Sequence, residues 1–596
     1  GLGLLSNVEG LAKPVPVIED TAVRPVDLPA YMADFDSMLS DLGLSCVYYA
    51  HISTGELHLR PVLDLKNPDH IRLFRRVAEE SAKLVKKYRG SLSGEHGDGR
   101  LRGEFIPWMV GDEIYDYFVR LKGIFDPGGM LNPGKITGTP PMDTSLRYSG
   151  SYQAPPFEPV FNYDHDGGFL QAVERCNGSG DCRRPSWYNG VMCPSYQASL
   201  DERLSTRGRS NLIREALSRP LNGKPFANPA LREILDQCLS CKGCKSECPS
   251  AVDMARYKAE IMHQYYLHHG MPLSVRLVSN ISRINRIFRK IPWFYNVALA
   301  IPPIEWLIKK LTGIHPDRKI PRLSNPALQT WIKKHSIGAE PNATGHSKGT
   351  VIFFVDEFTN DFDASIGKMG ITLLKSLGYH VIPYIGEESG RAPFSKGDLK
   401  RAKQCANRNV SWLRNMVNQE VPLVGIEPST LLVFRDEYPD IVDDELVEDA
   451  RRIGGNALLI EEFMVRELDK GNIGSQYFSD ESCSIVVHGH CHQKSLVKNS
   501  GLVRMLSIPG NYTAEELKSG CCGMAGSFGM ERKNYELSMK IGEQFLFPTI
   551  RQLGDGIIVA MPGTSCRQQL HDGTGKRAFH PVEILYKALK NNHSDE

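Results

Sequence analysis

Hydrophobic positions in the first part of the chain, up to about residue 136, follow strand-like and helical periods in turn. Over residues 47–63 they predict a β-hairpin, with Thr54 and Gly55 as its two-residue turn. Over residues 69–89 they recur at helical spacing and end before Gly90, which predicts an amphipathic helix. This mixture of elements predicts an α+β domain.

The pattern changes three times in the rest of the chain. Residues 137–166 are rich in Pro, Gly, Ser and Tyr without any period, which predicts a linker. Residues 257–324 are basic and amphipathic, with helical segments separated by prolines. The C-terminal part predicts two copies of an α/β unit, which begin with strands at 351–355 and 484–488.

Composition is that of an ordinary globular protein, with 41% hydrophobic and 23% charged residues, and a length of 596 residues predicts several domains. A formal net charge of +2 argues against nucleic acid as a partner. The hydrophobic stretch 291–308 is interrupted by prolines and by Glu305, so it does not predict a membrane span. The chain begins at Gly1 with neither an initiator Met nor a signal peptide, and we expect it to be part of a longer protein.

The 14 cysteines are concentrated in short runs, which in a large enzyme-like chain indicates metal binding in a reducing compartment. One run has ferredoxin spacing and ends in proline: Cys238, Cys241, Cys244, Cys248 and Pro249. Its first three thiolates are spaced to hold one face of a [4Fe–4S] cluster, whereas Cys248 faces a neighbouring cluster. Cys193, also followed by proline, is the natural fourth ligand of the first cluster. A zinc ribbon would instead use two separated CxxC pairs.

The site of a second cluster is less regular. Cys176 and Cys182 keep the outer positions of a ferredoxin run, but Ser179 stands where the middle cysteine would be. Together with Cys248, three thiolates converge. Three interpretations remain open: a [3Fe–4S] cluster, a [4Fe–4S] cluster completed by Ser179 or another group, or no second cluster. The spacing resembles the [3Fe–4S] site of the iron–sulfur component of succinate dehydrogenase, which favours some second cluster.

Two motifs near the start of the chain carry further candidate chemistry. If Thr54 and Gly55 form the hairpin turn, His51 and His58 lie opposite each other with Cβ atoms ~5 Å apart, close enough to share a metal ion. Residues 94–99 read Gly-Glu-His-Gly-Asp-Gly. Three glycines in six residues indicate a backbone that turns tightly or approaches a ligand closely.

Together with Phe-Asp-Pro at 125–127 and Asn-Pro-Gly-Lys at 132–135, these motifs resemble the C-terminal part of FAD-linked 2-hydroxyacid dehydrogenases of the vanillyl-alcohol oxidase family. Within that family they are most similar to the D-2-hydroxyglutarate and D-lactate dehydrogenases. The resemblance extends to large bacterial fusions of this flavin domain with a ferredoxin segment and a cysteine-rich region, and in that form it covers nearly the whole chain. The family's N-terminal pyrophosphate-binding domain has no counterpart in this sequence.

The resemblance implies a role for each residue of the two motifs. His51, His58 and Glu95 would bind a divalent metal, commonly zinc, that holds the hydroxyl and carboxylate of the substrate. His96 would be the catalytic base, which takes the hydroxyl proton while hydride leaves for the flavin. FAD would be contacted by the remaining motif residues: Gly97, Asp98, Gly99 and Asn132. The alternative is that these histidines are ordinary polar surface groups.

The second C-terminal copy holds a further set of cysteines, Cys491, Cys521, Cys522 and Cys566, with His490 and His492 nearby. It resembles the CCG domain of heterodisulfide reductase and of the iron–sulfur components of glycolate oxidase and anaerobic glycerol-3-phosphate dehydrogenase. Adjacent cysteines do not easily bind one ion tetrahedrally, but they can ligate different irons of a cluster. The first copy has Glu388, Ser389 and Thr430 in the corresponding places, so at most one cofactor is expected. The alternative is buried free thiols in a domain that has lost its cofactor.

The predicted fold class is multidomain α/β and α+β, with an all-α ferredoxin-like iron–sulfur domain and tandem α/β CCG-type domains. The predicted division is the C-terminal part of an FAD-linked oxidase domain (1–138), a linker (139–166), a 4Fe-4S ferredoxin-type domain (167–256), a helical connector (257–345), a degenerate CCG-like repeat (346–470) and a CCG cysteine-rich domain (471–596).

The predicted function is FAD- and iron–sulfur-dependent oxidation of a D-2-hydroxy acid to the 2-oxo acid, with D-2-hydroxyglutarate ahead of D-lactate or glycolate. Electrons would pass to a quinone, a cytochrome or an electron-transfer flavoprotein. The alternative is a non-catalytic electron-transfer protein that serves a quinone, which would have no use for a substrate metal. We expect a homo-oligomer in the cytoplasm. Residues 257–311, basic and rich in aromatic residues, either contact the inner face of the cell membrane or form a buried brace between domains.

Overall fold

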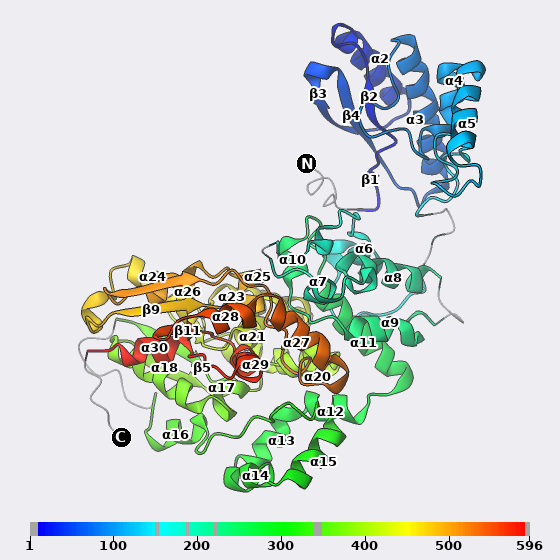
Figure 1. The fold of residues 1–596 in the computed structure, drawn as a ribbon. Coiled ribbons are helices and arrows are strands. Elements are labelled where there is room, and N and C mark those ends of the chain that lie inside the picture. Colours follow the sequence, from blue (N-terminus) through cyan, green and yellow to red (C-terminus); the bar gives the residue numbers. More distant parts are fainter. Residues whose placement is uncertain are drawn as a thin grey trace. The chain divides into compact units, whose positions relative to one another are not determined.

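The computed structural model describes residues 10–148, 152, 154–185, 187–188, 190–219, 224–338 and 348–590. The chain divides into two compact units, 1–154 and 155–596, and most of their helices and strands are labelled in Figure 1. Parts of the predicted linker (149–151 and 153) and of the predicted connector (339–345) lie outside the described residues. The finer division into six segments stays a prediction.

The first unit contains an antiparallel sheet whose central strand, β4, pairs with the other three. Its strands and larger helices are β1 (Lys13–Pro14), β2 (Ile18–Ala22), α2 (Leu28–Asp41), β3 (Cys46–His51), β4 (Glu56–Leu63), α3 (Pro68–Lys87), α4 (Ile106–Val110) and α5 (Asp112–Phe125). Phe35 of α2, Phe74 and Val85 of α3, and Leu59 of β4 pack in one buried cluster. The sheet and these two helices therefore enclose the core of an α+β unit.

The predicted helix at 69–89 is confirmed as α3. It begins after Asn67, whose side-chain oxygen accepts a hydrogen bond from the backbone N–H of Asp69 at 2.8 Å. Pro68 occupies the first turn, where a missing N–H is harmless. The helix ends before Arg89, which has a left-handed φ of 53°.

The hairpin of β3 and β4 is confirmed, but its predicted turn is wrong. His51 pairs with Glu56, and Tyr49 pairs with His58, because the residues after His51 form a 3-10 turn that ends on Gly55, with φ 75°. The register is therefore displaced by two residues, and a shift of two keeps every side chain on its face of the sheet. His51 and His58 are still neighbours, with ring centroids 5.2 Å apart.

The second unit begins with helices that surround the predicted iron–sulfur segment. They are α6 (Phe169–Glu174), α7 (Pro194–Ser199), α8 (Thr206–Ser218), α9 (Pro229–Asp236), α10 (Gly243–Glu247) and α11 (Met254–His269). α11 is buried along most of its length. The hydroxyl of Tyr257 on α11 donates a hydrogen bond to the carbonyl oxygen of Ala172 on α6 at 2.6 Å. The long helix therefore supports the shorter ones.

The predicted basic segment forms a succession of short helices. They are α12 (Leu273–Ser279), α13 (Ile281–Phe288), α14 (Pro292–Ala298), α15 (Pro302–Thr312) and α16 (Leu328–Lys334). Pro292 and Pro302 stand in the first turns of α14 and α15, so the prolines that interrupt the sequence pattern start these helices. None of the described helices is long and apolar enough to cross a bilayer.

The C-terminal part contains two parallel sheets, with strand orders β6-β5-β7-β8 and β10-β9-β11. The predicted strands at 351–355 and 484–488 are β5 and β9. The strands are β5 (Thr350–Phe354), β6 (His380–Tyr384), β7 (Leu423–Gly425), β8 (Ala457–Leu459), β9 (Cys483–Val487), β10 (Tyr512–Glu516) and β11 (Ile557–Ala560). Phe353 of β5 and Val487 of β9 belong to one buried cluster, so the two sheets share a core.

Helices cover both sheets (Figure 1). The helices that connect and follow the strands of the first sheet are α17 (Glu357–Asp361), α18 (Ala364–Ser376), α19 (Arg391–Lys396), α20 (Leu399–Leu413), α21 (Pro428–Leu431), α22 (Val433–Asp436), α23 (Val447–Gly455) and α24 (Ile460–Asp469). Those of the second are α25 (Cys491–Leu496), α26 (Ser500–Leu506), α27 (Tyr535–Gln544), α28 (Leu546–Gln552), α29 (Thr564–Thr574) and α30 (Pro581–Lys587).

Arg318, between α15 and α16, anchors the connector on the second sheet and its helices. Its side chain is fully buried. The guanidinium donates hydrogen bonds to the carbonyl oxygen of Gly529 (2.8 Å), the hydroxyl of Ser538 (3.0 Å) and the carboxylate of Asp572 (2.7 Å). Arg322, later in the same segment, is exposed.

Replacement of Arg318 by methionine should destabilise the second unit by roughly 3–5 kcal/mol, because it leaves the buried Asp572 carboxylate without the guanidinium. The free energy of unfolding, from urea denaturation of the full chain, measures the loss. The control Arg322→Met removes an exposed cation and should change this free energy by less than about 0.5 kcal/mol. Equal stability of the two variants would contradict the anchoring role.

Candidate functional site

In the first unit, the carboxylate of Glu95 faces three histidines. Its Oε1 lies 3.2 Å from Nε2 of His96, 3.7 Å from Nε2 of His51 and 3.8 Å from Nε2 of His58. The ligand atoms of His51, His58 and Glu95 all lie within 4.8 Å of one another, so the three residues can hold one ion. The residues expected to bind the metal and the expected base are thus grouped around one carboxylate.

His58 is the buried member of this group. Its ring stacks on Tyr49 and on His96, with centroids 4.8 Å and 5.2 Å apart. Burial lowers the pKa of His58, so the imidazole is neutral and keeps a lone pair for a metal. Its buried Nδ1 has no hydrogen-bond partner among the described residues and lies 3.8 Å from a carboxylate oxygen of Glu19. A neutral ring that presents Nε2 to Glu95 and Nδ1 to Glu19 fits a divalent cation on either side.

Asp20, a residue not predicted from the sequence, holds the loop that carries Glu95 and His96. It is fully buried on β2, at a bulge against β4, with φ 84°. Its carboxylate accepts hydrogen bonds from the backbone N–H groups of Glu95 and His96, both at 2.9 Å, and from the hydroxyl of Ser93. Burial raises the pKa of Asp20, but hydrogen bonds from Glu56, Ser93 and the backbone outweigh burial and lower it below its usual range. The charged carboxylate therefore orients both loop residues.

Glu19 is a second residue that was not predicted. It accepts hydrogen bonds from the hydroxyl of Tyr49 at 2.8 Å and from Arg60 at 2.6 Å. With His58 and His96 it forms an alternative set of ligand atoms within 4.8 Å. A signal was present in the sequence, because Glu19 and its neighbour Asp20 are acids between the apolar runs 14–18 and 22–23, and acids in such a buried strand need partners.

The expected flavin-binding residues lie on the same loop and on the segment after α5. Gly97 and Gly99 have φ of 77° and 55°, and a Cβ at either would meet no atom of the described residues within 4 Å. The loop therefore presents open backbone to a ligand. The backbone N–H of Ile136 donates to the carbonyl oxygen of Gly99 at 3.1 Å, which ties that segment to the loop. Asp98 is half-buried and Asn132 is exposed.

In the second unit, three cysteines with ferredoxin spacing are buried where the chain enters α10: Cys238, Cys241 and Cys244. A Cβ on Gly243 would lie 2.8 Å from the carbonyl carbon of Val191 and 2.9 Å from the nitrogen of Met192. Only glycine therefore lets this loop approach the segment that leads to Cys193.

Cys193, the expected fourth ligand, is buried between the two predicted cluster sites. Its thiol accepts a hydrogen bond from the backbone N–H of Thr206 at 3.1 Å. A hydrogen bond to Cys182 and burial both raise the pKa of Cys193, and charges on Cys182 and Cys244 add to the effect. The thiol thus interacts with a member of each predicted site.

The second predicted site groups Cys176, Cys182 and Cys248. Cys182 is buried, and a hydrogen bond from Cys193 lowers the pKa of Cys182 to about 6, which favours its thiolate. Cys248 is half-buried and interacts electrostatically with Cys182. Cys176 is buried, whereas Ser179, in the place of the missing cysteine, is exposed.

Beyond the carboxyl end of β9, the four cysteines of the last repeat form two close pairs. The Sγ atoms of Cys491 and Cys521 are 3.1 Å apart, and those of Cys522 and Cys566 are 3.4 Å apart. Hydrogen bonds from Cys521 and Cys566 lower the pKa of Cys522 well below its ordinary value. His488, which was not predicted, has a ring nitrogen within 4.8 Å of the sulfurs of Cys522 and Cys566. A thiolate among thiols and an imidazole is a donor set for a metal or an iron–sulfur group.

The two cysteine-rich regions of the second unit touch each other. His492 Nε2 lies 2.9 Å from the carbonyl oxygen of Ser240, and the hydroxyl of Ser495 donates to the carbonyl oxygen of Cys241 at 3.2 Å. Cys241, Cys491 and Cys521 belong to one buried hydrophobic cluster. The side chain of His490 instead caps the first turn of α25.

At the corresponding edge of the first sheet, polar side chains form hydrogen bonds and ion pairs with their neighbours. The hydroxyl of Ser389 donates to Glu357 at 2.7 Å, and Arg401 pairs with Glu388. The hydroxyl of Thr430 donates to the carbonyl oxygen of Glu427 at 3.0 Å. Polar groups that bond their neighbours thus stand in the places where the second sheet has cysteines, although Oε2 of Glu388 has no hydrogen-bond partner among the described residues.

Comparison with known proteins agrees with this arrangement. Residues 2–136 match the C-terminal domain of FAD-linked oxidases, and residues 172–252 match the 4Fe-4S dicluster domain. The D-2-hydroxyglutarate dehydrogenase of Escherichia coli K12 is 29% identical over 99% of this chain and 60% of its own length. That of Pseudomonas putida is 30% identical over 98% of this chain and 60% of its own length. The chain is thus similar to these D-2-hydroxyglutarate dehydrogenases along nearly its whole length.

A further relative is one component of the anaerobic glycerol-3-phosphate dehydrogenase of E. coli K12, 27% identical over 49% of this chain and 72% of its own length. The chain spans about 60% of the length of the D-2-hydroxyglutarate dehydrogenases that it matches.

The two family matches confirm the predicted FAD-linked oxidase and 4Fe-4S domains. The zinc ion, the second cluster and the CCG type of the two repeats stay predictions.

Proposed function

We propose that the protein containing this chain oxidises a D-2-hydroxy acid to the 2-oxo acid with FAD and iron–sulfur clusters, and that D-2-hydroxyglutarate is the first candidate substrate. The observation that carries the proposal is Glu95, whose carboxylate faces His51, His58 and His96 within 3.8 Å. A protein that only carries electrons has no use for such a group. The names of the relatives in E. coli and P. putida support the choice of substrate.

The proposed metal ligands are His51, His58 and Glu95, which leave coordination positions for the substrate. When bound, a divalent metal such as zinc would polarise the substrate hydroxyl and hold its carboxylate. His96 lies at the exposed edge of the group, where its Nε2 can take the hydroxyl proton. Asp20 holds the backbone of Glu95 and His96, so that ligand and base keep their separation.

FAD would accept the hydride that leaves the substrate Cα. We infer that the flavin is contacted by Gly97, Asp98, Gly99 and Asn132. The open backbone at Gly97 and Gly99 supports this assignment. In this scheme residues 1–138 form one part of the flavin domain. They are followed by the linker (139–166), the 4Fe-4S domain (167–256), the helical connector (257–345) and the two CCG-type repeats (346–470 and 471–596).

Electrons would leave through the second unit, one at a time. The proposed ligands of the first cluster are Cys238, Cys241, Cys244 and Cys193, those of a second cluster are Cys176, Cys182 and Cys248, and those of a CCG-type centre are Cys491, Cys521, Cys522 and Cys566. The cluster of buried residues that contains Cys241 and Cys491 supports a direct passage between the first and last of these sites.

A second candidate function is that of an electron-transfer component without its own substrate. The similarity to the component of the anaerobic glycerol-3-phosphate dehydrogenase supports it, because that relative is matched over 72% of its length. This second function would give the group around Glu95 no role, and we therefore rank it second.

We further propose that α14 and α15 contact an anionic membrane surface. The run 291–304 has no charged residue, yet Trp293 is 62% exposed and Trp306 is 58% exposed. Residues 273–312 contain seven Lys or Arg and a single acid, and three of the seven, Arg286, Arg289 and Lys309, pair with acids. A globular protein seldom exposes such a surface without a partner, and the excess of positive charge suits anionic lipid. This exposure disfavours the alternative of a buried brace.

His51→Ala should abolish turnover and remove the divalent metal, because the two remaining ligands do not close the coordination sphere. His96→Ala should keep the metal and lose turnover by about 10²–10⁴-fold, since only the proton acceptor is removed. Metal analysis and steady-state kinetics of the complete flavin-loaded enzyme measure both effects. The visible spectra of flavin and clusters should be unchanged.

The control for these variants is His70→Ala, since His70 lies on α3 and accepts a hydrogen bond only from the backbone of Asp64 among the described residues. It should retain both metal and activity. Wild-type metal content and turnover in His51→Ala would rule out the metal-assisted mechanism and move the electron-transfer component to first place.

The double variant Trp293→Ser/Trp306→Ser should lose most of its binding to vesicles that contain phosphatidylserine, since two aromatic anchors are removed. Wild-type protein should co-sediment with these vesicles at low salt and leave them at high salt. Trp412→Ser, at an exposed tryptophan on α20, is the matched control and should bind normally. Failure of the wild-type protein to co-sediment with anionic vesicles at low salt would refute the surface assignment.

A further inference from the structure

A cavity of about 510 Å³ opens in the second unit beside Cys238. Its wall is formed by Cys238 and Leu239 of the ferredoxin loop, by α11 and α12, and by the segment that precedes α27. This volume is within the range of small-molecule sites, which is roughly 300–1,000 Å³. Apart from Cys238, none of the residues that line it has a role in the chemistry proposed above.

One part of the cavity lining is apolar. It is formed by Leu239, Met262, Val275, Val278 and Phe528. Phe528 is buried, and Val275 and Val278 come from successive turns of α12. A lining of this kind accepts a flat hydrophobic ring or an isoprenoid chain and offers little to a hydrophilic ligand.

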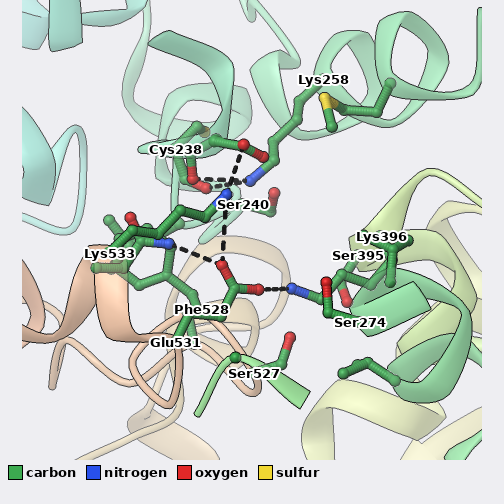
Figure 2. A pocket seen from close by; sticks show the side chains of 18 of the residues that line it. Cys238, Ser240, Lys258, Ser274, Ser395, Lys396, Ser527, Phe528, Glu531 and Lys533 are labelled. Atoms are coloured by element: carbon green, nitrogen blue, oxygen red, sulfur yellow. Dashed lines mark hydrogen bonds and ion pairs between the residues drawn. The ribbon is translucent and has the colours of Figure 1, made fainter. Parts of the chain in front are cut away.

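The other part of the lining is polar. Figure 2 shows the carboxylate of Glu531 between the ammonium groups of Lys396 and Lys533. Lys533 also pairs with Asp236 at 2.6 Å, and its side chain is half exposed, so water reaches this end of the cavity. Hydrogen-bond donors beside an apolar wall match a molecule that has carbonyl oxygens at the edge of a hydrophobic ring.

The cavity lies next to the exposed apolar surface described above, because α12 lines it and α15 ends at it. α12 contributes Val275 and Val278 to the wall, while its Leu273 is 60% exposed. α12 packs against α15, whose last residue, Thr312, is itself part of the lining. A lipid-soluble molecule can therefore approach the cavity along the surface that we assign to the membrane.

We propose that this cavity binds a lipid-soluble quinone, which is the electron acceptor of the proposed reaction. The inference rests on the proposed function and names its acceptor. Oxidation of each hydroxy acid releases two electrons and two protons. The electrons leave past Cys238 and reduce the quinone, which takes two protons from water at the polar end of the cavity and leaves as quinol.

The test uses the complete holoenzyme with two variants that fill the cavity from different walls, Val278→Trp and Ser527→Trp. Reduction of decylubiquinone by D-2-hydroxyglutarate should fall by about tenfold or more in both, since a bulky side chain occupies the ring site. Anaerobic bleaching of the flavin by the same substrate should be unchanged, because it occurs before electrons reach the cavity. Ser500→Trp, at an exposed position on α26, is the control and should keep both rates.

A second readout is independent of turnover. The fluorescence of the quinone analogue 2-heptyl-4-hydroxyquinoline N-oxide should be quenched by oxidised wild-type and Ser500→Trp protein, and binding to the two cavity variants should be weaker by about tenfold. Normal quinone reduction and normal analogue binding in both cavity variants would overturn the proposal. Wild-type protein that binds no analogue and reduces only an electron-transfer flavoprotein would overturn it as well. Analogue binding in an enzyme whose flavin is not bleached by substrate would instead reject the proposed substrate and leave the cavity assignment standing.

Discussion

The backbone contact at Gly243 is the constraint on which the cysteine-rich part of the second unit depends. A side chain there would collide with the backbone of Val191 and Met192, and the cysteine loop would then lie too far from the segment that ends in Cys193. When the loop packs against this segment, the carbonyl groups of Ser240 and Cys241 lie within hydrogen-bonding distance of His492 and Ser495 on α25. One close approach of two backbones thus brings three separate cysteine segments into a single buried region.

In the first unit, the candidate site is instead held together by a buried carboxylate. Asp20 lies at a bulge of β2 and accepts hydrogen bonds from the backbone of Glu95 and His96. The pKa of Asp20 is held below its usual range, so its charge persists over the physiological pH range and keeps the loop in place. In both units, then, buried backbone contacts position the loops that carry the candidate site residues.

Much of this could be predicted from local sequence patterns, and the exceptions share a cause. The helix α3, the hairpin and the two central strands β5 and β9 follow from periodicity. The hairpin register did not, because it depends on a 3-10 turn after His51 that competes with the two-residue turn. Asp20, Glu19 and His488 act through partners that are far away in the chain, and no local pattern identifies such partners. The cavity beside Cys238 combines several separate segments and is invisible in any one of them.

In the proposed function, electrons removed from a D-2-hydroxy acid in the first unit appear on iron in the second. Freeze-quench electron paramagnetic resonance of the anaerobic holoenzyme, mixed with D-2-hydroxyglutarate, follows this transfer directly. We predict that flavin absorbance falls first and that the signal of a reduced [4Fe–4S] cluster then rises, with no response to the L-enantiomer and no such signal in Cys238→Ser. Flavin reduction without any cluster signal, or the same signal in Cys238→Ser, would contradict the account.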